Sequence, residues 1–186
     1  MSLKVGLLND SFPPTIDGVA NTVINYARVL HDMGCGVTVI TPKYPRAEDN
    51  YDFDVYRYFS IGLNKRIGYR AGIPTPVSAG RILSKKLDIL HVHAPFVSSI
   101  MAKSVSIRPH RSPTVFTYHT KFDIDIDARV KNKPIRKIAR RIVLANINMA
   151  DEVWVVTETA AKSLRDLGYK GDYMVMENGT DFPRGK

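Results

Sequence analysis

Three histidines stand at the ends of apolar segments, where α/β proteins commonly place their functional groups. His91 and His93 are two residues apart in the run 88–93, so on a β-strand their side chains share one face. His119 directly follows the next strand-like run, 113–118. Imidazole rings can bind a metal ion, move a proton or hydrogen-bond to a substrate. Together, these three side chains could in principle form a three-histidine metal site.

The metal hypothesis has a plainer alternative. No acidic cluster surrounds these histidines, and histidines near the end of a strand are commonly hydrogen-bonded to their neighbours, so we expect no metal ion. His119 differs from the other two because it ends a central strand and begins an irregular polar stretch. Ligands of parallel sheets bind at the carboxyl ends of the strands, so this position suits a side chain that meets substrate.

The loop from Asn9 to Gly18 is a second candidate site. It follows the apolar run 3–8 and ends in a single glycine at the start of a predicted helix. A glycine there lets a phosphate approach the backbone N–H groups at the positive end of the helix. A plainer interpretation is that Asp17 caps the helix and Gly18 opens it. The loop lacks the G-x-G-x-x-G fingerprint, which disfavours a dehydrogenase.

Two charged stretches have ordinary interpretations beside functional ones. Asp123, Asp125 and Asp127 alternate as in a calcium loop but lack its Gly and terminal Glu, so we expect a solvated loop. A basic stretch farther on could hold phosphates or an anionic membrane surface, but a solvated helix face opposite a core stripe explains it slightly better. The basic stretch consists of Arg129, Lys131, Lys133, Arg136, Lys137, Arg140 and Arg141.

Strand-like and helix-like segments alternate along nearly the whole chain. This order predicts an α/β fold with a doubly wound, mostly parallel, Rossmann-like sheet and helices on both faces. The segment 60–76 has no clear period and is rich in Gly and Pro, so we expect a loop there. The helix at 134–149 should cover the sheet with an apolar stripe that includes Ile135, Ile138 and Ile142. The other predicted helices are 18–33, 77–87, 96–106 and 159–167, and the strands are 3–8, 37–40, 53–59, 88–93, 113–118, 152–156 and 173–176.

Composition limits the class of protein. The chain has 186 residues, 44% of them apolar, which fits one globular domain. No apolar run approaches the length that spans a membrane, and a predicted strand begins almost at once, so we expect no signal peptide. Cys35 is the only cysteine, which excludes an internal disulfide and fits a cytoplasmic protein. The net charge of +9 favours phosphate-bearing ligands, anionic membranes or nucleic acid. Neither the charge nor the aromatic residues, which lie mostly in strand-like runs, choose among these partners, and we expect no nucleic acid.

Four motifs, taken together, resemble one family. They read SFPPTIDGVA at 11–20, HVHAPF at 91–96, TYHTKF at 117–122 and ENGTD at 177–181. In this order they resemble the N-terminal domain of the retaining GT-B glycosyltransferases of family 4, and most of all the branch that glycosylates glycerolipids and phosphatidylinositol. The resemblance covers nearly the whole chain.

The resemblance implies a two-domain enzyme whose active site lies in the cleft between two Rossmann-like halves. The N-terminal half mainly holds the acceptor, and the C-terminal half mainly holds a UDP- or GDP-sugar as donor substrate, without a further cofactor. It implies that Gly18, with Asp17, approaches the donor diphosphate and that His119 is catalytic, beside the transferred sugar. The residues implied at the acceptor side of the cleft are His93, Phe96, Tyr118 and Thr120, and those leading into the second domain are Asn178, Gly179 and Asp181.

This chain departs from the family pattern in two ways. Asp17-Gly18 stands where many members have Gly-Gly, and the donor domain with its paired Glu residues is absent. We therefore expect residues 1–186 to be an acceptor-binding half that is inactive in isolation, with a small-molecule, saccharide or lipid acceptor. The alternative is a non-catalytic basic module that binds an anionic membrane or polyanion. Both are compatible with a peripheral position at the inner face of the membrane.

Overall fold

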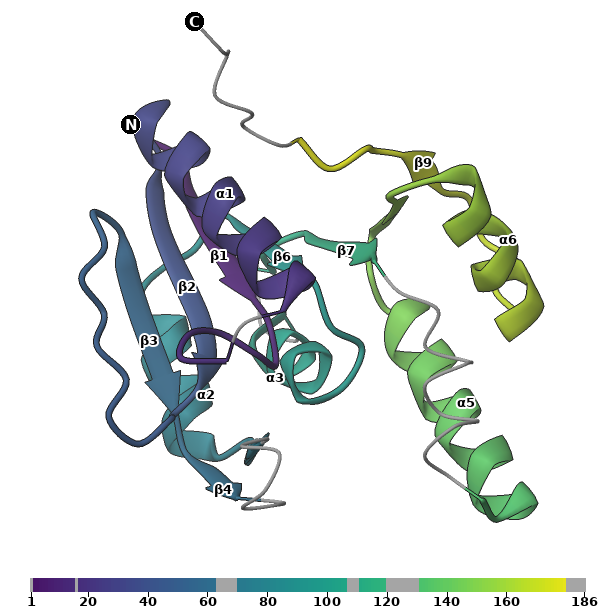
Figure 1. Ribbon diagram of the computed structural model, residues 1–186. Helices are drawn as coiled ribbons and strands as arrows, with labels where there is room; N and C mark the ends of the chain where they lie inside the picture. The colour runs from purple at the N-terminus through teal and green to yellow at the C-terminus, as the bar shows by residue number, and fades with distance from the viewer. Residues whose placement is uncertain (1, 16, 63–69, 107–110, 120–130, 180–186) are drawn as a thin grey trace, which may run out of the picture.

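Seven parallel strands form the central sheet of this protein (Figure 1). The computed structural model describes residues 2–15, 17–62, 70–106, 111–119 and 131–179. The strand order β3-β2-β1-β6-β7-β8-β9 puts the N-terminal strand near the centre and confirms the predicted Rossmann-like sheet. The strands are β1 Lys4–Leu8, β2 Gly36–Pro42, β3 Asp54–Tyr58, β6 Ile89–Val92, β7 Thr114–Tyr118, β8 Glu152–Val155 and β9 Met174–Val175.

Helices cover both faces of the sheet, as predicted, and each face has its own apolar core. On one face, Val23 and Ala27 of α1 pack in a cluster with Leu7 of β1. On the other face, the buried side chains of four helices join one larger cluster, which includes Met101 of α3 and Leu164 of α6. The helices are α1 Gly18–Asp32, α2 Pro76–Ser84, α3 Val97–Ser106, α5 Lys133–Ile147 and α6 Glu158–Leu167.

Polar side chains fix where several helices begin. The side chains of Asp17, Thr75 and Thr157 each accept a hydrogen bond from the backbone N–H three residues later, at the starts of α1, α2 and α6. After α1, Gly34 adopts a left-handed φ of 84°, which agrees with its predicted place just beyond the helix. These local signals explain why the predicted helices match the observed ones to within a few residues.

The described parts of the segment 60–76 are more regular than the sequence predicted. Strands β4 (Ser60–Gly62) and β5 (Arg70–Gly72) pair antiparallel as a separate two-stranded sheet. The Arg70 guanidinium donates to the Oγ and the carbonyl oxygen of Ser60, at 2.8 and 2.9 Å. A Cβ at Gly72 would lie 2.3 Å from a ring carbon of Tyr58, so the close approach needs glycine. These side-chain hydrogen bonds add to the backbone pairing of the two strands, and hydrophobic periodicity does not reveal them.

The apolar stripe of α5 also differs from its prediction. Ile135, Ile138 and Ile142 are 54%, 55% and 52% exposed, whereas Val143 and Ile147 are fully buried against the sheet. The C-terminal part of the helix contacts the core, and its N-terminal part projects past α3 (Figure 1). The core prediction holds for Val143, which belongs to the same predicted stripe, and is wrong for the three isoleucines, because they lie on a different side of the helix from Val143 and Ile147. None of the described helices is long and apolar enough to cross a membrane.

Replacing Leu164 with Ala should destabilise the chain by about 2–5 kcal/mol, because the substitution leaves a cavity where α6 meets the sheet. Leu164 is fully buried, so the structure around it can close the space only in part. The measurement is urea unfolding of the chain. Met33→Ala is the matched control because Met33 is 74% exposed, and its cost should stay within about 0.5 kcal/mol. Equal losses in the two variants would contradict the assigned core.

Candidate functional site

The carboxyl ends of the three central strands meet at one edge of the sheet. β1 pairs with β6, and β6 pairs with β7, all in the same direction, so the loops that follow them are neighbours. The N–H of His93 donates to the carbonyl oxygen of Leu8 at 2.9 Å, which extends the strand pairing into the loop after β6. This edge carries the first loop, the loop after β6 and His119. Parallel α/β sheets bind ligands at such an edge.

A hydrogen bond between two histidines lies at the centre of this edge. Nδ1 of His93 and Nε2 of His119 are 2.8 Å apart. The His93 side chain is fully buried, and His119 is partly exposed. The structure thus brings His119, the predicted catalytic residue, into contact with a residue predicted at the acceptor side.

His91 completes the cluster from within β6. Its Nε2 lies 2.7 Å from the hydroxyl of Thr117, and its ring centroid is 4.1 Å from that of His93, so the two side chains share a face as predicted. Tyr26 of α1 and Trp154 of β8 pack their rings against His91. Within the described part of the chain, no three His, Cys, Asp or Glu side chains are placed to hold a metal ion.

Burial keeps these histidines neutral. It lowers the pKa of His91 to about 3 and the pKa of His119 to about 4, and it holds the pKa of His93 well below its usual value. The neighbouring charge of Asp17 opposes the effect of burial on His119, but burial dominates. Each ring is therefore a neutral imidazole near pH 7, with one nitrogen that donates a hydrogen bond and one that accepts.

The start of α1 lies at the same edge. The carboxylate of Asp17 accepts a hydrogen bond from the N–H of Ala20 at 2.7 Å, which confirms the capping interpretation. A Cβ built on Gly18 would meet no atom within 4 Å, so space is open beside the first turn. In the hydrogen bonds of the described residues, the N–H groups of Gly18 and Val19 have no acceptor. They remain available to an anion at the positive end of the helix.

Asp10 is a site residue that the sequence analysis missed. Its Oδ1 accepts hydrogen bonds from the backbone N–H and the hydroxyl of Ser98, both at 2.9 Å, and so caps α3 from a position 88 residues earlier. Burial raises the pKa of this carboxyl to about 6, although the bonds from Ser98 act in the opposite direction. The sequence did offer one signal for this residue, an Asp shortly after a buried strand.

Arg57 of β3 is a second missed residue, and it holds the first loop in place. Its guanidinium donates to the carbonyl oxygen of Pro13 at 2.7 Å and to that of Pro42 at 3.3 Å. The same group forms a two-point ion pair with Asp49, at 2.8 and 2.7 Å. The side chain of Arg57 is only 9% exposed. No sequence signal indicates which arginine would serve this loop.

The remaining predicted residues are scattered. Phe96 is 44% exposed in the loop before α3. Tyr118 is fully buried, with its hydroxyl 3.2 Å from that of Ser163, so neither Tyr118 nor His93 presents its side chain to solvent in this structure. Asn178 and Gly179 are exposed after β9. Thr120, Asp181, Arg129 and the three aspartates at 123, 125 and 127 lie outside the described residues.

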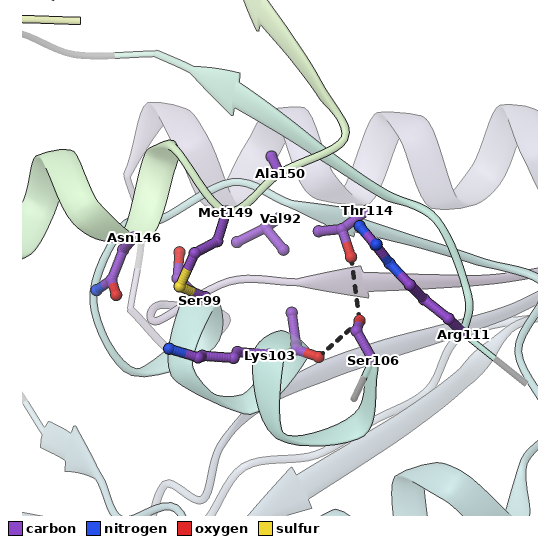
Figure 2. Close-up of a pocket in the computed structure, with 10 residues that line it drawn as sticks. Val92, Ser99, Lys103, Ser106, Arg111, Thr114, Asn146, Met149 and Ala150 are labelled. Atoms are coloured by element: carbon purple, nitrogen blue, oxygen red, sulfur yellow. Dashed lines mark hydrogen bonds between the residues drawn. The ribbon is translucent and has the colours of Figure 1, made fainter. Parts of the chain in front are cut away.

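A cavity of about 330 Å³ lies away from the histidines, on the face of the sheet that α3 and α5 cover. Figure 2 shows its lining, in which the hydroxyl of Ser106 bonds to that of Thr114 and to the carbonyl oxygen of Ala102. Arg111 pairs with Asp151, and the amide of Asn146 donates to the carbonyl oxygen of Pro95. These polar groups are engaged in holding the fold together.

The fold is a Rossmann-like domain of the kind found in GT-B glycosyltransferases. The family model named Glycosyltransferase Family 4 matches residues 16–184, and the chain belongs to this family. The expected resemblance is thereby confirmed.

Individual relatives agree with the family. An alpha-monoglucosyldiacylglycerol synthase from Acholeplasma laidlawii is 27% identical over 122 residues, which cover 64% of this chain and 30% of that protein. A GDP-mannose-dependent alpha-mannosyltransferase from Corynebacterium glutamicum is 24% identical and is matched over 98% of this chain and 44% of its own length. The solved structure of sucrose-phosphate synthase from Thermosynechococcus elongatus has a TM-score of 0.62 at 15% identity, over 96% of this chain and 49% of that one. The chain therefore spans less than half the length of these relatives.

Acid should destabilise the chain through its buried histidines. Their pKa values are lower in the folded state than in the unfolded state. Below about pH 6.5 the unfolded chain therefore binds more protons than the folded chain, and the free energy of unfolding falls as the pH drops below that value. Each unit of pKa difference is worth about 1.4 kcal/mol. The measurement is the free energy of unfolding in urea between pH 4 and 7.5, which should rise with pH.

Asp10→Asn provides the matched test of this prediction. The raised pKa of the Asp10 carboxyl has the opposite effect on how stability changes with pH, since the folded chain then binds more protons than the unfolded chain between about pH 4 and 6. Removing the carboxyl should make stability rise more steeply with pH over that interval. A shallower rise in the variant would contradict the assignment.

Proposed function

We propose that this chain is the acceptor-binding half of a retaining glycosyltransferase that uses a nucleotide-diphosphate sugar. The observation that carries the proposal is His119, which ends a central strand, bonds to a buried histidine and lies at the same edge as the open start of α1. The resemblance to the family implies that a histidine at this position lies beside the transferred sugar. The second, donor-binding domain would face this edge, and the segment with Asn178, Gly179 and Asp181 would lead into it.

The start of α1 supplies the proposed contact with the donor. The N–H groups of Gly18 and Val19 point from the positive end of a 15-residue helix, and nothing occupies the space where a side chain of residue 18 would stand. Such a helix end stabilises the negative charge that builds up on a departing diphosphate. Asp17 contributes by fixing where the helix begins, because its carboxylate is used by Ala20.

The chemistry of the edge also fits transfer better than hydrolysis. Double-carboxylate hydrolases place two acidic side chains on either side of the bond they cleave. At this edge Asp17 caps α1 and Asp10 caps α3, so both described carboxyls are engaged in structural hydrogen bonds. A neutral imidazole such as His119 can donate a hydrogen bond to an oxygen of the sugar or the phosphate without adding charge.

The names of two relatives support a choice of donor nucleotide and of acceptor. One relative is named for GDP-mannose and another for the synthesis of a glucosylated diacylglycerol, so a UDP- or GDP-sugar and a lipid acceptor fit the proposal. Phe96 is the exposed aromatic side chain at this edge that could contact an acceptor. The isolated chain should lack transferase activity and bind a nucleotide-sugar weakly, because the donor-binding residues would lie in the other domain.

His119→Ala in the full-length protein should lower kcat by about 10²–10³-fold, since it removes one group that stabilises the transferred sugar or its leaving group. The measurement is steady-state sugar transfer with circular dichroism as a test of folding. His31→Ala, in the last turn of α1 and so at the opposite end of that helix from the strand-end edge, is the matched control and should retain activity. Wild-type turnover in a folded His119→Ala protein would refute the role given to this residue.

A second candidate function is binding to an anionic membrane surface through α5. Ile135, Ile138 and Ile142 form an exposed apolar stripe, and Lys133, Lys137 and Arg141 are exposed on the same helix. Amphipathic helices with these two features lie in the headgroup region of anionic bilayers. A transferase with a lipid acceptor needs such a position, so this function is compatible with the first one.

Reversing the three exposed charges of α5 should weaken binding to anionic vesicles by about tenfold or more. The measurement is cosedimentation of the full-length protein with phosphatidylglycerol or phosphatidylcholine vesicles at low and high salt. The variant Lys133→Glu, Lys137→Glu, Arg141→Glu is compared with Lys103→Glu, Lys162→Glu, Lys170→Glu, which changes the net charge equally on other helices and loops. Equal pelleting with both lipids, or equal effects of the two variants, would exclude a role of α5 in charge-driven binding.

A further inference from the structure

We propose that His93 is a positioning residue, whose Nδ1–H donates to Nε2 of His119 and thereby keeps the proton of His119 on its Nδ1. His119 then presents a hydrogen-bond donor, and not a free lone pair, to whatever binds beside it. The catalytic consequence rests on the function proposed above. The direction of the hydrogen bond is a property of the folded chain and can be tested without activity.

The geometry is that of a true hydrogen bond between two rings. The nitrogens are 2.8 Å apart, the ring planes differ by 22°, and the ring centroids are 5.1 Å apart. Nearly coplanar rings whose centroids are much farther apart than their closest nitrogens meet edge to edge, with the N–H of one directed at the lone pair of the other. Because both rings are neutral, one of them must donate and the other must accept.

The far nitrogen of His93 decides between the two directions. Nε2 of His93 is buried, and no hydrogen-bond partner for it exists among the described residues. If His119 donated, the proton of His93 would sit on this Nε2 and leave a buried N–H unsatisfied. If His93 donates from Nδ1, Nε2 keeps a lone pair without a proton. Buried N–H groups without an acceptor are rarer in proteins than unpaired acceptors, so the second arrangement is favoured.

The surroundings of His93 hold its ring in this orientation. The ring of His91 lies against it at 4.1 Å between centroids, and Tyr26 of α1 packs beside it at 5.5 Å. His91 is itself fixed by its bond to Thr117, and the backbone N–H of His93 is bonded to Leu8. A ring packed on several sides and bonded at its base has little freedom to exchange its two nitrogens.

The consequence for His119 is chemical. Its Nε2 accepts from His93, so its Nδ1 carries the proton and can donate to a lone pair on a hydroxyl or phosphate oxygen. In this state the ring cannot remove a proton from an acceptor hydroxyl, because neither nitrogen offers a free lone pair. His119 is therefore expected to bind and orient an oxygen of the donor or acceptor, and not to serve as a general base.

The test is the protonation pattern of the imidazole nitrogens, read from long-range ¹H–¹⁵N spectra of this chain labelled with ¹⁵N-histidine. The expected result is that His93 and His119 both carry the proton on Nδ1, opposite to the tautomer that an unconstrained histidine favours. Assignment uses the loss of one ring signal in each single histidine variant. A proton on Nε2 of His119 in the wild-type chain would overturn the proposal, whatever the activity of the protein.

Two variants of His93 separate the hydrogen bond from mere packing. In His93→Asn, the amide nitrogen can stand in for Nδ1 and donate to His119, so His119 should keep its proton on Nδ1. In His93→Leu the donor is lost, and His119 should gain the Nε2–H tautomer. An unchanged tautomer in a folded His93→Leu chain would overturn the proposal. If that variant does not fold, the wild-type and His93→Asn spectra still decide the question.

Activity of the full-length protein then tests the consequence. His93→Leu should lower kcat by about 10–100-fold with a smaller change in KM, and His93→Asn should recover most of the loss. Equal losses in both variants would indicate a packing role and overturn the positioning assignment. If the tautomers are as expected but His119→Ala remains active, the proposed function fails while the direction of the hydrogen bond stands.

Discussion

The structure depends on the burial of β6 at the centre of a parallel sheet. Helices cover both faces of the sheet there, so the polar side chains of β6 cannot be solvated by water and must pair with protein groups. His91 of β6 pairs with Thr117 of β7, and His93, just after β6, pairs with His119, just after β7. The same burial makes charge costly, which is why these imidazoles stay neutral. A cluster that looks like metal ligands in the sequence is therefore a set of hydrogen-bonded rings.

The candidate functional edge is built from contacts between segments far apart in the chain. Asp10 from the first loop caps α3, His93 after β6 meets His119 after β7, and Arg57 of β3 holds the carbonyl oxygen of Pro13. Each of these bonds joins a loop to a rigid element or to another loop. The relative positions of the candidate groups are consequently set by the order of strands in the sheet, and the edge is a product of the whole fold.

Sequence reasoning succeeded where the signal is local. The alternation of strand and helix patterns, the cap at Asp17 and the glycine beyond α1 each depend on a few neighbouring residues, and the structure agrees with all of them. Sequence reasoning failed where a residue's position depends on groups far away in the chain. The Arg70 side chain of β5 bonds to Ser60 of β4, and which side of α5 meets the core, marked by Val143 and Ile147, decides that Ile138 is exposed. The position of His119 at the edge was predictable, but the burial of His93 beneath it depends on three strands and on α1.

The anchoring of the first loop by Arg57 affects how a ligand would bind there. The guanidinium reaches Pro13, Pro42 and Asp49 at once, so the loop has fixed neighbours before any ligand arrives. A flexible loop gives up conformational entropy when it closes on a ligand, which weakens the observed affinity. Here much of that entropy is already lost during folding. The loop as far as Pro13 is thus fixed by the fold itself, and a ligand at this edge would lose little further conformational entropy in ordering that part of the loop.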